Sequence, residues 1–295
     1  MDFVFHIMIL VCIYAVLSIS LDLIAGHAGL ISLAQAAFYG LGAYTSALMT
    51  TRIGASFSFG IFAGMVVATL ISFIVSVPSL RLRDDYFVLA TFAFQMVIVS
   101  VLNNCINVTR GPLGVPGIPE PIIFGITIQY RGAFLLLSAT AAVAAYIVCA
   151  YVSRSPFGRV LRAIREDEMV AKSAGKNTVR FKIFVFAIGS ALAALAGSLY
   201  AHYVTYIDPS SFTVMESILV LSMVIIGGAG SLWGPAVGAV VLVVLPEILR
   251  FIGLPSSVAA NVRQIIYGGL LVAFMMWRPQ GLLGKYAFRS REAKE

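Results

Sequence analysis

Charged residues are scarce in this sequence. Lys, Arg, Asp and Glu supply 11% of the 295 residues, while hydrophobic residues supply 60%. Mean hydropathy is +0.97. A soluble domain normally carries about a quarter of its residues as charges, because charge must cover its surface. The shortage of charge therefore excludes a soluble fold.

Cysteine and histidine are also rare, with three of each. The cysteines are Cys12, Cys105 and Cys149, and the histidines are His6, His27 and His202. Each cysteine lies in or near an apolar run without a CxxC pair, which predicts three buried, inert thiols. The histidines are dispersed along the chain. We therefore expect no disulfide framework, no metal site and no catalytic constellation, so the chain is not predicted to be an enzyme.

Long apolar runs dominate what is present. A helix needs about 20 mostly apolar residues to cross a hydrocarbon core of roughly 30 Å. The runs are Phe3–Ile24, Leu30–Met49, Phe57–Leu80, Tyr86–Asn103, Gly132–Tyr151, Ile183–Tyr203, Val214–Ile226, Ala236–Phe251 and Val262–Trp277. They predict an all-α, polytopic membrane protein with about 8–9 transmembrane or half-membrane helices. We expect a single transmembrane domain over residues 1–295, and a permanent first helix because no Lys or Arg precedes Arg52.

The net charge of +7 is concentrated between the apolar runs. Residues 154–182 carry eight basic residues, the tail from 278 to 295 carries five, and Arg81 and Arg83 add two. Basic loops stay on the cytoplasmic side of a membrane. Two runs separate the first pair from the loop and four separate the loop from the tail, so all three regions can share one side. This predicts a cytoplasmic C-terminus and an external N-terminus, with no nucleic-acid surface.

The run Val214–Ile226 is short for a complete span and ends at a glycine-rich segment, 227–231. It could be a broken or re-entrant helix, which a membrane tolerates where protein or a water-filled cavity surrounds it. The spacing of Gly227 and Gly230 echoes that of Gly26 and Gly29, each pair being followed by an apolar run. Transporter folds often contain repeated broken helices, although chance explains this echo equally well.

A few ionisable residues lie within or at the ends of the apolar runs. They are Asp22, Glu216, Glu247 and Arg250. Such residues are functional candidates in a membrane, but these four lie near predicted helix ends, where side chains reach the interface. Glu216 is the strongest candidate for a role with substrate or gating. The middle of the spans carries no carboxylate, which argues against a proton- or sodium-coupled carrier.

The loop at 154–182 is the most informative segment. Ser155 and Pro156 suit a helix start and Gly175 suits its end. The apolar residues that can share a face of this helix are Val160, Ile164, Met169, Val170 and Ala171. An amphipathic helix of mixed charge suits contact with another protein, whereas a basic loop touching lipid head groups is the alternative. The segment from Gly175 to Thr178 lacks the glycine and the Ser or Thr spacing of a phosphate-binding loop, so any ATP is hydrolysed by another chain.

Five ordered stretches together resemble the permease subunits of branched-chain amino acid ABC importers, and the LivM type most closely. Residues 26–45 read GHAGLISLAQAAFYGLGAYT, residues 227–235 read GGAGSLWGP, and residues 278–284 read RPQGLLG. The other two are the loop at 154–182 and the turn-rich segment Thr109–Pro119, which alone reads as a connector or as a docking element for an external partner. The resemblance covers nearly the whole chain.

The resemblance implies partners and site residues. It implies a second homologous permease, two cytoplasmic ATP-binding subunits that hold ATP and magnesium, and a periplasmic substrate-binding protein, all at a bacterial inner membrane. No cofactor is implied in this chain. The residues it places at the ATPase-coupling loop are Gly158, Arg162, Ala163, Ile164, Arg165, Glu166, Asp167 and Gly175. The candidates for the translocation pathway are Ser32, Gln35, Phe38, Tyr44 and Glu216.

The function implied is ATP-driven import of a small polar solute, most specifically branched-chain or other amino acids, by alternating access. This sequence departs from many relatives at Leu30, where they carry a polar residue, and at Ala34-Gln35, where they carry a small residue and a histidine. Relatives also move urea, short amides and carboxylates, so these solutes stay open. A self-contained secondary transporter or channel is the other class, and it would need a coupling-ion site or selective pore within this chain.

Overall fold

The computed structural model describes residues 2–80, 84–123, 126–128, 130–250, 266–274, 276, 278 and 280–284. Arg81, Arg83, part of the last predicted span and most of the predicted basic tail lie outside these residues. The described chain is almost entirely helical, which confirms the all-α prediction. Four of its longest helices are α1 (Asp2–Asp22), α3 (Phe57–Ser79), α6 (Arg131–Arg154) and α9 (Thr178–Val204).

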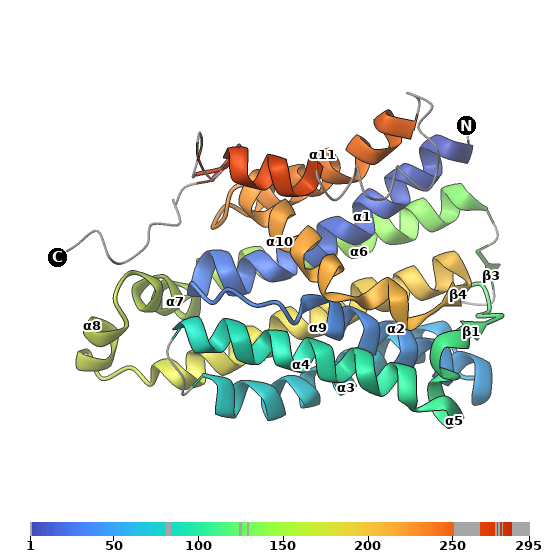
Figure 1. Ribbon diagram of the computed structural model, residues 1–295, viewed down its shortest axis with the longest axis horizontal. Coiled ribbons are helices and arrows are strands. Elements are labelled where there is room, and N and C mark those ends of the chain that lie inside the picture. The colour runs from blue at the N-terminus through green and yellow to red at the C-terminus, as the bar shows by residue number, and fades with distance from the viewer. Residues whose placement is uncertain are drawn as a thin grey trace.

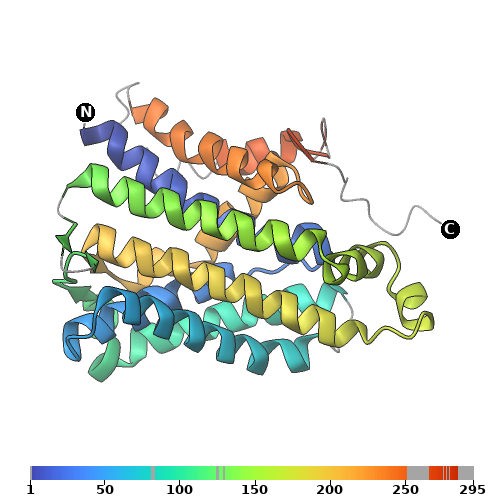
Figure 2. The same ribbon diagram turned by 180° about the vertical axis from the view of Figure 1, so that it is seen from behind.

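The long helices run alongside one another between two ends of the molecule (Figures 1 and 2). One end carries the short helices α7 (Pro156–Glu166) and α8 (Glu168–Ser173). The other carries the N-terminus, the short helix α5 (Ile106–Thr109) and the strands (Figure 1). Among the described residues, five helical segments are long and apolar enough to cross a membrane: Asp2–His27, Phe57–Ser79, Tyr86–Asn104, Arg131–Arg154 and Thr178–Val204.

The outer helices bury small residues and expose large apolar ones. In α3 the buried face includes Gly60, Gly64 and Ser72, whereas Phe62 and Ile74 are 64% and 73% exposed. A water-soluble helix would show the reverse. Small residues let helix backbones approach closely in a bilayer, and large apolar residues suit contact with lipid tails. The pattern identifies the exposed face of α3 as lipid-facing, and α6 repeats it with Ser138 buried.

Helix α2 (Gln35–Arg52) lies in the interior. It packs mainly against α3 and α9, and most of its side chains are buried. Close packing requires glycine here: a Cβ on Gly42 would lie 2.2 Å from the carbonyl oxygen of Ala194, and one on Gly197 would lie 1.9 Å from that of Tyr39. Because protein surrounds α2, its sequence is not required to match lipid.

The connection from α1 to α2 is irregular. The last turn of the first helix widens into a π-helix, Leu23–His27 (η1), and residues 29–34 are not helical. Gly29 has φ of +73°, a conformation that glycine adopts readily. Helix α2 begins at Gln35, so the apolar run predicted from Leu30 starts with non-helical backbone. That backbone is tolerable at membrane depth because protein covers it.

Helix α10 (Val214–Gly227) has 14 residues and is short, as the apolar run predicted. A single helical turn, η3 (Pro209–Phe212), precedes it and packs against α2 and against α4 (Asp84–Asn104). Gln95, near the middle of α4, donates to the carbonyl oxygen of Phe212 at 2.7 Å. Helix α10 therefore begins level with the middle of α4, and its length confirms that this run is short for a complete span. Helix α11 (Trp233–Arg250) then packs back along α1 and α10.

Short strands close the end opposite α7 and α8 (Figure 1). Strand β1 (Val115–Pro116) pairs with β4 (Tyr206–Ile207), and β2 (Ile122–Ile123) pairs with β3 (Ile126–Thr127); both pairs are antiparallel. The 3-10 turn η2 (Gly111–Leu113) precedes β1. Cys105 at this end is exposed and Cys12 is only half-buried, so the prediction of three buried thiols is confirmed for Cys149 alone. Cys105 lies between α4 and α5, at the N-cap position of α5.

Candidate functional site

The loop between α6 and α9 folds into two helices instead of the single predicted helix. Helix α7 ends at Glu166, and Asp167 takes an extended conformation before α8 begins. The Asp167 carboxylate accepts hydrogen bonds from the backbone N–H groups of Met169 and Val170 at 2.8 and 3.1 Å. An aspartate in this position is a strong helix N-cap. The prediction of one helix from Gly158 to Gly175 missed this internal cap, although Gly175 does follow the last turn, with φ of +75°.

The break divides the predicted apolar face. Leu161 and Ile164 of α7 are buried against the body of the protein, and Arg162 donates to the carbonyl oxygen of Ser153 at 2.9 Å. Met169 and Val170 of α8 are instead 71% and 64% exposed. One side of the loop therefore packs on this chain, and the other presents apolar side chains outward.

The start of α7 is tightly fixed. The Ser155 hydroxyl accepts a hydrogen bond from the backbone N–H of Gly158 at 3.3 Å, and Pro156 occupies the first turn. A Cβ on Gly158 would lie 2.2 Å from the Ser153 carbonyl oxygen, so only glycine fits. Ala163 lies on the exposed side of the helix. The predicted Ser-Pro helix start is confirmed.

Arg165 points into the protein. Its guanidinium donates to the carbonyl oxygen of Gly26, within the π-helix at the end of α1. The aliphatic part of the side chain covers Gly29, where a Cβ would lie 3.0 Å from the Arg165 Cγ. Arg165 therefore connects α7 to the irregular segment between α1 and α2, whereas its neighbour Glu166 is exposed.

The two glycine-rich segments meet at this same place. The Asp22 carboxylate accepts a hydrogen bond from the backbone N–H of Gly230 at 2.7 Å. A Cβ on Gly26 would lie 2.5 Å from that Gly230 nitrogen. Asp22 has no solvent exposure, so the prediction that it reaches the interface was wrong. Its second oxygen lies 3.4 Å from Nδ1 of His27, a contact between residues that are only five apart in the sequence.

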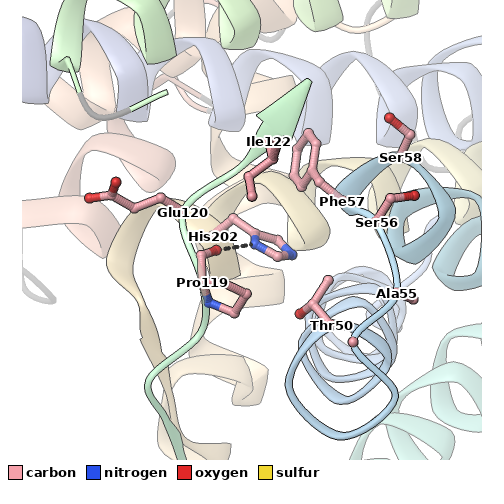
Figure 3. A pocket seen from close by; sticks show the side chains of 10 residues that line it. Thr50, Ala55, Ser56, Phe57, Ser58, Pro119, Glu120, Ile122 and His202 are labelled. Carbon is pink, nitrogen blue, oxygen red and sulfur yellow. Dashed lines mark hydrogen bonds between the residues drawn. The ribbon is translucent and has the colours of Figure 1, made fainter. Parts of the chain in front are cut away.

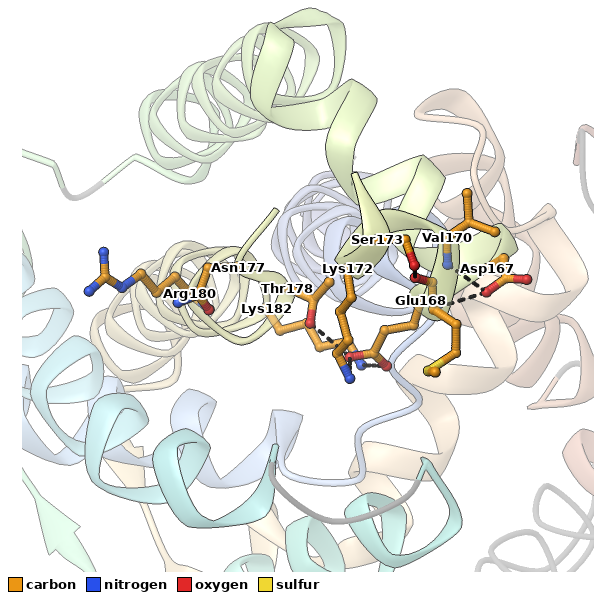
Figure 4. Close-up of polar contacts among 10 residues, drawn as sticks. Asp167, Glu168, Val170, Lys172, Ser173, Asn177, Thr178, Arg180 and Lys182 are labelled. Carbon is orange, nitrogen blue, oxygen red and sulfur yellow. Dashed lines mark hydrogen bonds and ion pairs between the residues drawn. The ribbon is translucent and has the colours of Figure 1, made fainter. Parts of the chain in front are cut away.

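A carboxylate fixes α8 to α9 (Figure 4). Glu168 lies 2.7 Å from Nζ of Lys182 and 3.1 Å from Nζ of Lys172, and it accepts from the Thr178 hydroxyl at 2.9 Å. Partial burial alone would raise the pKa of the Glu168 carboxyl, but the hydrogen bonds from these partners outweigh it and lower the pKa to about 2. Glu168 is therefore ionised at neutral pH, and it holds α8 in a defined position.

The predicted pathway residues separate into two groups. Ser32, Gln35 and Phe38 are buried in contacts between helices: Gln35 donates to the Ser20 hydroxyl at 2.5 Å, and the Phe38 ring lies 5.3 Å from that of Phe94. Tyr44 and Glu216 flank the segment that leads into α10. The Tyr44 ring lies 5.9 Å from that of Phe212, and Glu216 accepts a hydrogen bond from Tyr14 at 2.5 Å.

Sequence reasoning missed four residues beside this second group. They are Tyr14, Tyr39, Gln95 and Phe212. Gln95 carried a usable signal, because a polar amide near the middle of an apolar span needs a partner or a role. Tyr14 and Tyr39 carried none, since an aromatic residue within an apolar run suits the interior of any helical membrane protein. Phe212 lies between two predicted runs, where the sequence offers no signal for it.

A cavity of about 480 Å³ opens at the end opposite α7 and α8, between the turn joining α2 to α3 and the segment around Pro119 (Figure 3). His202 forms part of its wall. Nδ1 of His202 donates to the Pro119 carbonyl oxygen at 2.8 Å, which leaves Nε2 to accept from the Ser46 hydroxyl at 3.0 Å. Both ring nitrogens are engaged, so this histidine stabilises the packing and is not poised as an acid or base.

Comparison with known proteins adds independent findings. A family model described as the permease component of branched-chain amino acid transport systems matches residues 3–275. The chain is 35% identical over 294 residues to the high-affinity branched-chain amino acid transport system permease protein LivM of Salmonella typhimurium, covering 92% of this chain and 68% of that protein. It is 34% identical to LivM of Escherichia coli K12, covering 93% and 68%.

The second permease type is also similar. The chain is 24% identical to LivH of Escherichia coli K12 over 290 residues, covering 92% of this chain and 91% of LivH. No solved structure matches the chain significantly. Similarity to both LivM and LivH indicates two related permeases within one heteromeric ABC transport system, and the match to LivM is the stronger.

Proposed function

The chain belongs to the family of permease components of branched-chain amino acid ABC transport systems, and we propose that it imports a branched-chain or similar amino acid as one subunit of such a complex. It is a permease and not the ATPase subunit. The proposed partners are a second, homologous permease, two cytoplasmic ATP-binding subunits and a periplasmic binding protein. The cluster of buried residues that runs through α1, α2, α6 and α9 supports a single permease domain.

The orientation we propose places α7 and α8 in the cytoplasm of a bacterium. Eight basic residues lie in this loop. At the opposite end, Arg52 donates to carbonyl oxygens of α5, Arg110 directly follows α5, and Arg131 donates to the carbonyl oxygen of Asp2 near the N-terminus. Basic loops are retained on the cytoplasmic side. The same orientation puts the N-terminus and the cavity near His202 outside, and it puts the C-terminal tail in the cytoplasm.

The proposed coupling role rests on the exposed tip of the loop, residues 166–170. Met169 and Val170 lie on α8 beside the exposed carboxylates of Glu166 and Asp167. The described part of this chain leaves both of these apolar side chains uncovered. Glu168 holds the tip rigidly on α9. A rigid apolar tip with acidic neighbours suits a groove on an ATPase subunit, and movement of that subunit would displace the whole loop.

The test is uptake of radiolabelled leucine into proteoliposomes that contain both permeases, the ATPase subunits and the binding protein. We expect uptake to require ATP and to stop with an ATPase variant that cannot hydrolyse it. Uptake without ATP, or by this chain alone under an ion gradient, would instead favour a secondary transporter. Urea, acetamide and 2-oxo acids serve as competing solutes.

The role of the tip has a separate test. Replacing Met169 and Val170 together by Gln should weaken binding of the ATPase subunits and reduce uptake, while the permease pair still assembles. Lys176→Gln, an exposed change in the same loop, is the matched control. Full ATPase binding and normal uptake by the double variant would contradict the docking role.

A further inference from the structure

Three buried polar atoms lack hydrogen-bond partners around Phe212. Within the described part of the chain, no partner lies near the hydroxyls of Tyr39 and Tyr44 or near Oε1 of Gln95. All three residues are at least nine-tenths buried. Buried polar atoms are nearly always satisfied, so a group of unsatisfied ones indicates a missing partner.

All three residues contact Phe212, either through its ring or through its backbone carbonyl group. The Tyr39 and Tyr44 rings lie 5.2 and 5.9 Å from the Phe212 ring, and the Gln95 amide donates to the Phe212 carbonyl oxygen. The Phe212 side chain is itself fully buried. It lies against Gly40, where a Cβ would approach its Cγ to 3.0 Å. Its ring also lies 6.3 Å from that of Tyr200 in α9, so Phe212 fills a space between α2, α4 and α9.

A carboxylate lies next to this space. Glu216, in the first turn of α10, accepts from Tyr14 at 2.5 Å. The backbone N–H of Ala36 donates a hydrogen bond to the Ser217 hydroxyl at 2.9 Å. This bond fixes the same turn of α10 to the start of α2. The Glu216 carboxylate and the Gln95 oxygen accept hydrogen bonds, the Tyr39 hydroxyl can accept or donate one, and the rings of Tyr39 and Phe212 lie beside them.

We propose that Phe212 occupies a mid-membrane binding site for the ammonium group and aliphatic side chain of the transported amino acid. This inference rests on the proposed function. The acceptors and aromatic faces suit a primary ammonium group, and the rings suit an aliphatic chain. Phe212 lies in the segment between α9 and α10, outside the long helices, and its withdrawal would free the polar atoms for the solute. In the arrangement described here the site is closed.

Removing the Phe212 side chain should let leucine leak through the closed site. We would reconstitute the whole complex with the Phe212→Ala substitution, omit ATP and binding protein, and measure downhill flux of radiolabelled leucine. Flux should exceed that of the wild-type complex, because the substitution opens the space. Phe212→Leu, a smaller change, should give an intermediate flux and guards against loss of folding. Leucine flux no greater than that of the wild-type complex with both variants would overturn the proposal.

The ammonium assignment is tested in the Phe212→Ala background. Adding Glu216→Gln should lower leucine flux about tenfold, because a hydrogen bond to a charged group is lost. Adding Gln95→Leu should lower it about fivefold, as expected for a weaker bond. Flux of 2-hydroxy-4-methylpentanoate, which carries a hydroxyl in place of the ammonium group, should change by less than twofold. Tyr203→Phe removes a tyrosine hydroxyl that contacts His6 outside the site, and it is the control.

An equal loss for both solutes, or no loss for either, would contradict ammonium recognition. ATP-driven leucine uptake by the wild-type complex is measured in the same vesicle preparation. If that uptake fails, the importer assignment fails, whereas the leak comparison still reports on the site. If uptake succeeds and every leak variant behaves as wild type, only the inference about Phe212 is wrong.

Discussion

Arg165 and Glu166 are neighbours in the sequence, yet the structure assigns them different roles that substitution can separate. Arg165 donates to the Gly26 carbonyl oxygen inside this chain, while Glu166 is exposed at the loop tip. We expect Arg165→Met to destabilise the permease itself. Methionine keeps the aliphatic contact with Gly29 but leaves the Gly26 carbonyl without the guanidinium.

The magnitude follows from the lost hydrogen bond. Bonds that involve a charged group contribute about 1.5–3 kcal/mol. A large domain loses roughly 2 °C of melting temperature for each kcal/mol, which predicts a decrease of about 3–6 °C. Arg159→Met removes an exposed arginine from the same helix and should change the melting temperature by less than about 1 °C, as surface substitutions do.

The assay is thermal unfolding of the purified permease pair in detergent, followed by binding of the ATPase subunits below the unfolding temperature. Arg165→Met should lower the melting temperature, whereas Glu166→Gln should leave it unchanged and weaken only ATPase binding. An Arg165→Met variant with wild-type stability and weakened ATPase binding would refute the inward role. Both residues would then act at the interface with the ATPase.

Three further predictions concern single positions. Glu168→Gln should release α8 and increase its proteolysis. The cost should be about 1 kcal/mol, because the ion pair with Lys182 is partly solvated. In the wild type the same release should appear as pH falls from about 4 toward 2, since the folded-state pKa of Glu168 lies below its ordinary value. Gly26→Ala should cost about 1–3 kcal/mol or more through overpacking, measured by thermal unfolding against Gly132→Ala, where a Cβ meets open space; equal stability would contradict the close approach. His202→Ala should cost about 1–3 kcal/mol, because it leaves the buried Ser46 hydroxyl without its hydrogen bond, and an unchanged melting temperature would show that this contact is dispensable.

Hydropathy predicted the membrane class and most spans correctly because lipid imposes its composition on every helix that touches it. Helices α3 and α6 display this on their exposed faces. The same reasoning was weaker for α2, which protein surrounds, and it placed the helix start at Leu30 instead of Gln35. Local hydropathy does not encode the close approach of Gly42 and Gly197 to neighbouring backbones, so the interior position of α2 became apparent only in three dimensions.

The candidate site shows a similar division. The Ser155-Pro156 start of α7 and the short length of α10 could be predicted because local residues determine them. The break at Asp167 had a local signal, an aspartate before a new turn, but it was hidden within a continuous amphipathic pattern. The contacts between Asp22 and Gly230 and between Arg165 and Gly26 join residues more than 130 positions apart. Nothing in a single sequence specifies such pairs.

Helix α10 connects the loop to the Phe212 site through two attachments to α1. Near its start, Glu216 accepts from Tyr14; beyond its end, Gly230 donates to Asp22. On α1 the attachment points Tyr14 and Asp22 are eight residues apart, which is about 12 Å at roughly 1.5 Å per residue. Because both attachments lie on α1, we expect α1 and α10 to move together when Arg165 is displaced. Phe212 lies outside this pair and is held by α2 and α4, so such a movement would change its position relative to Glu216 first.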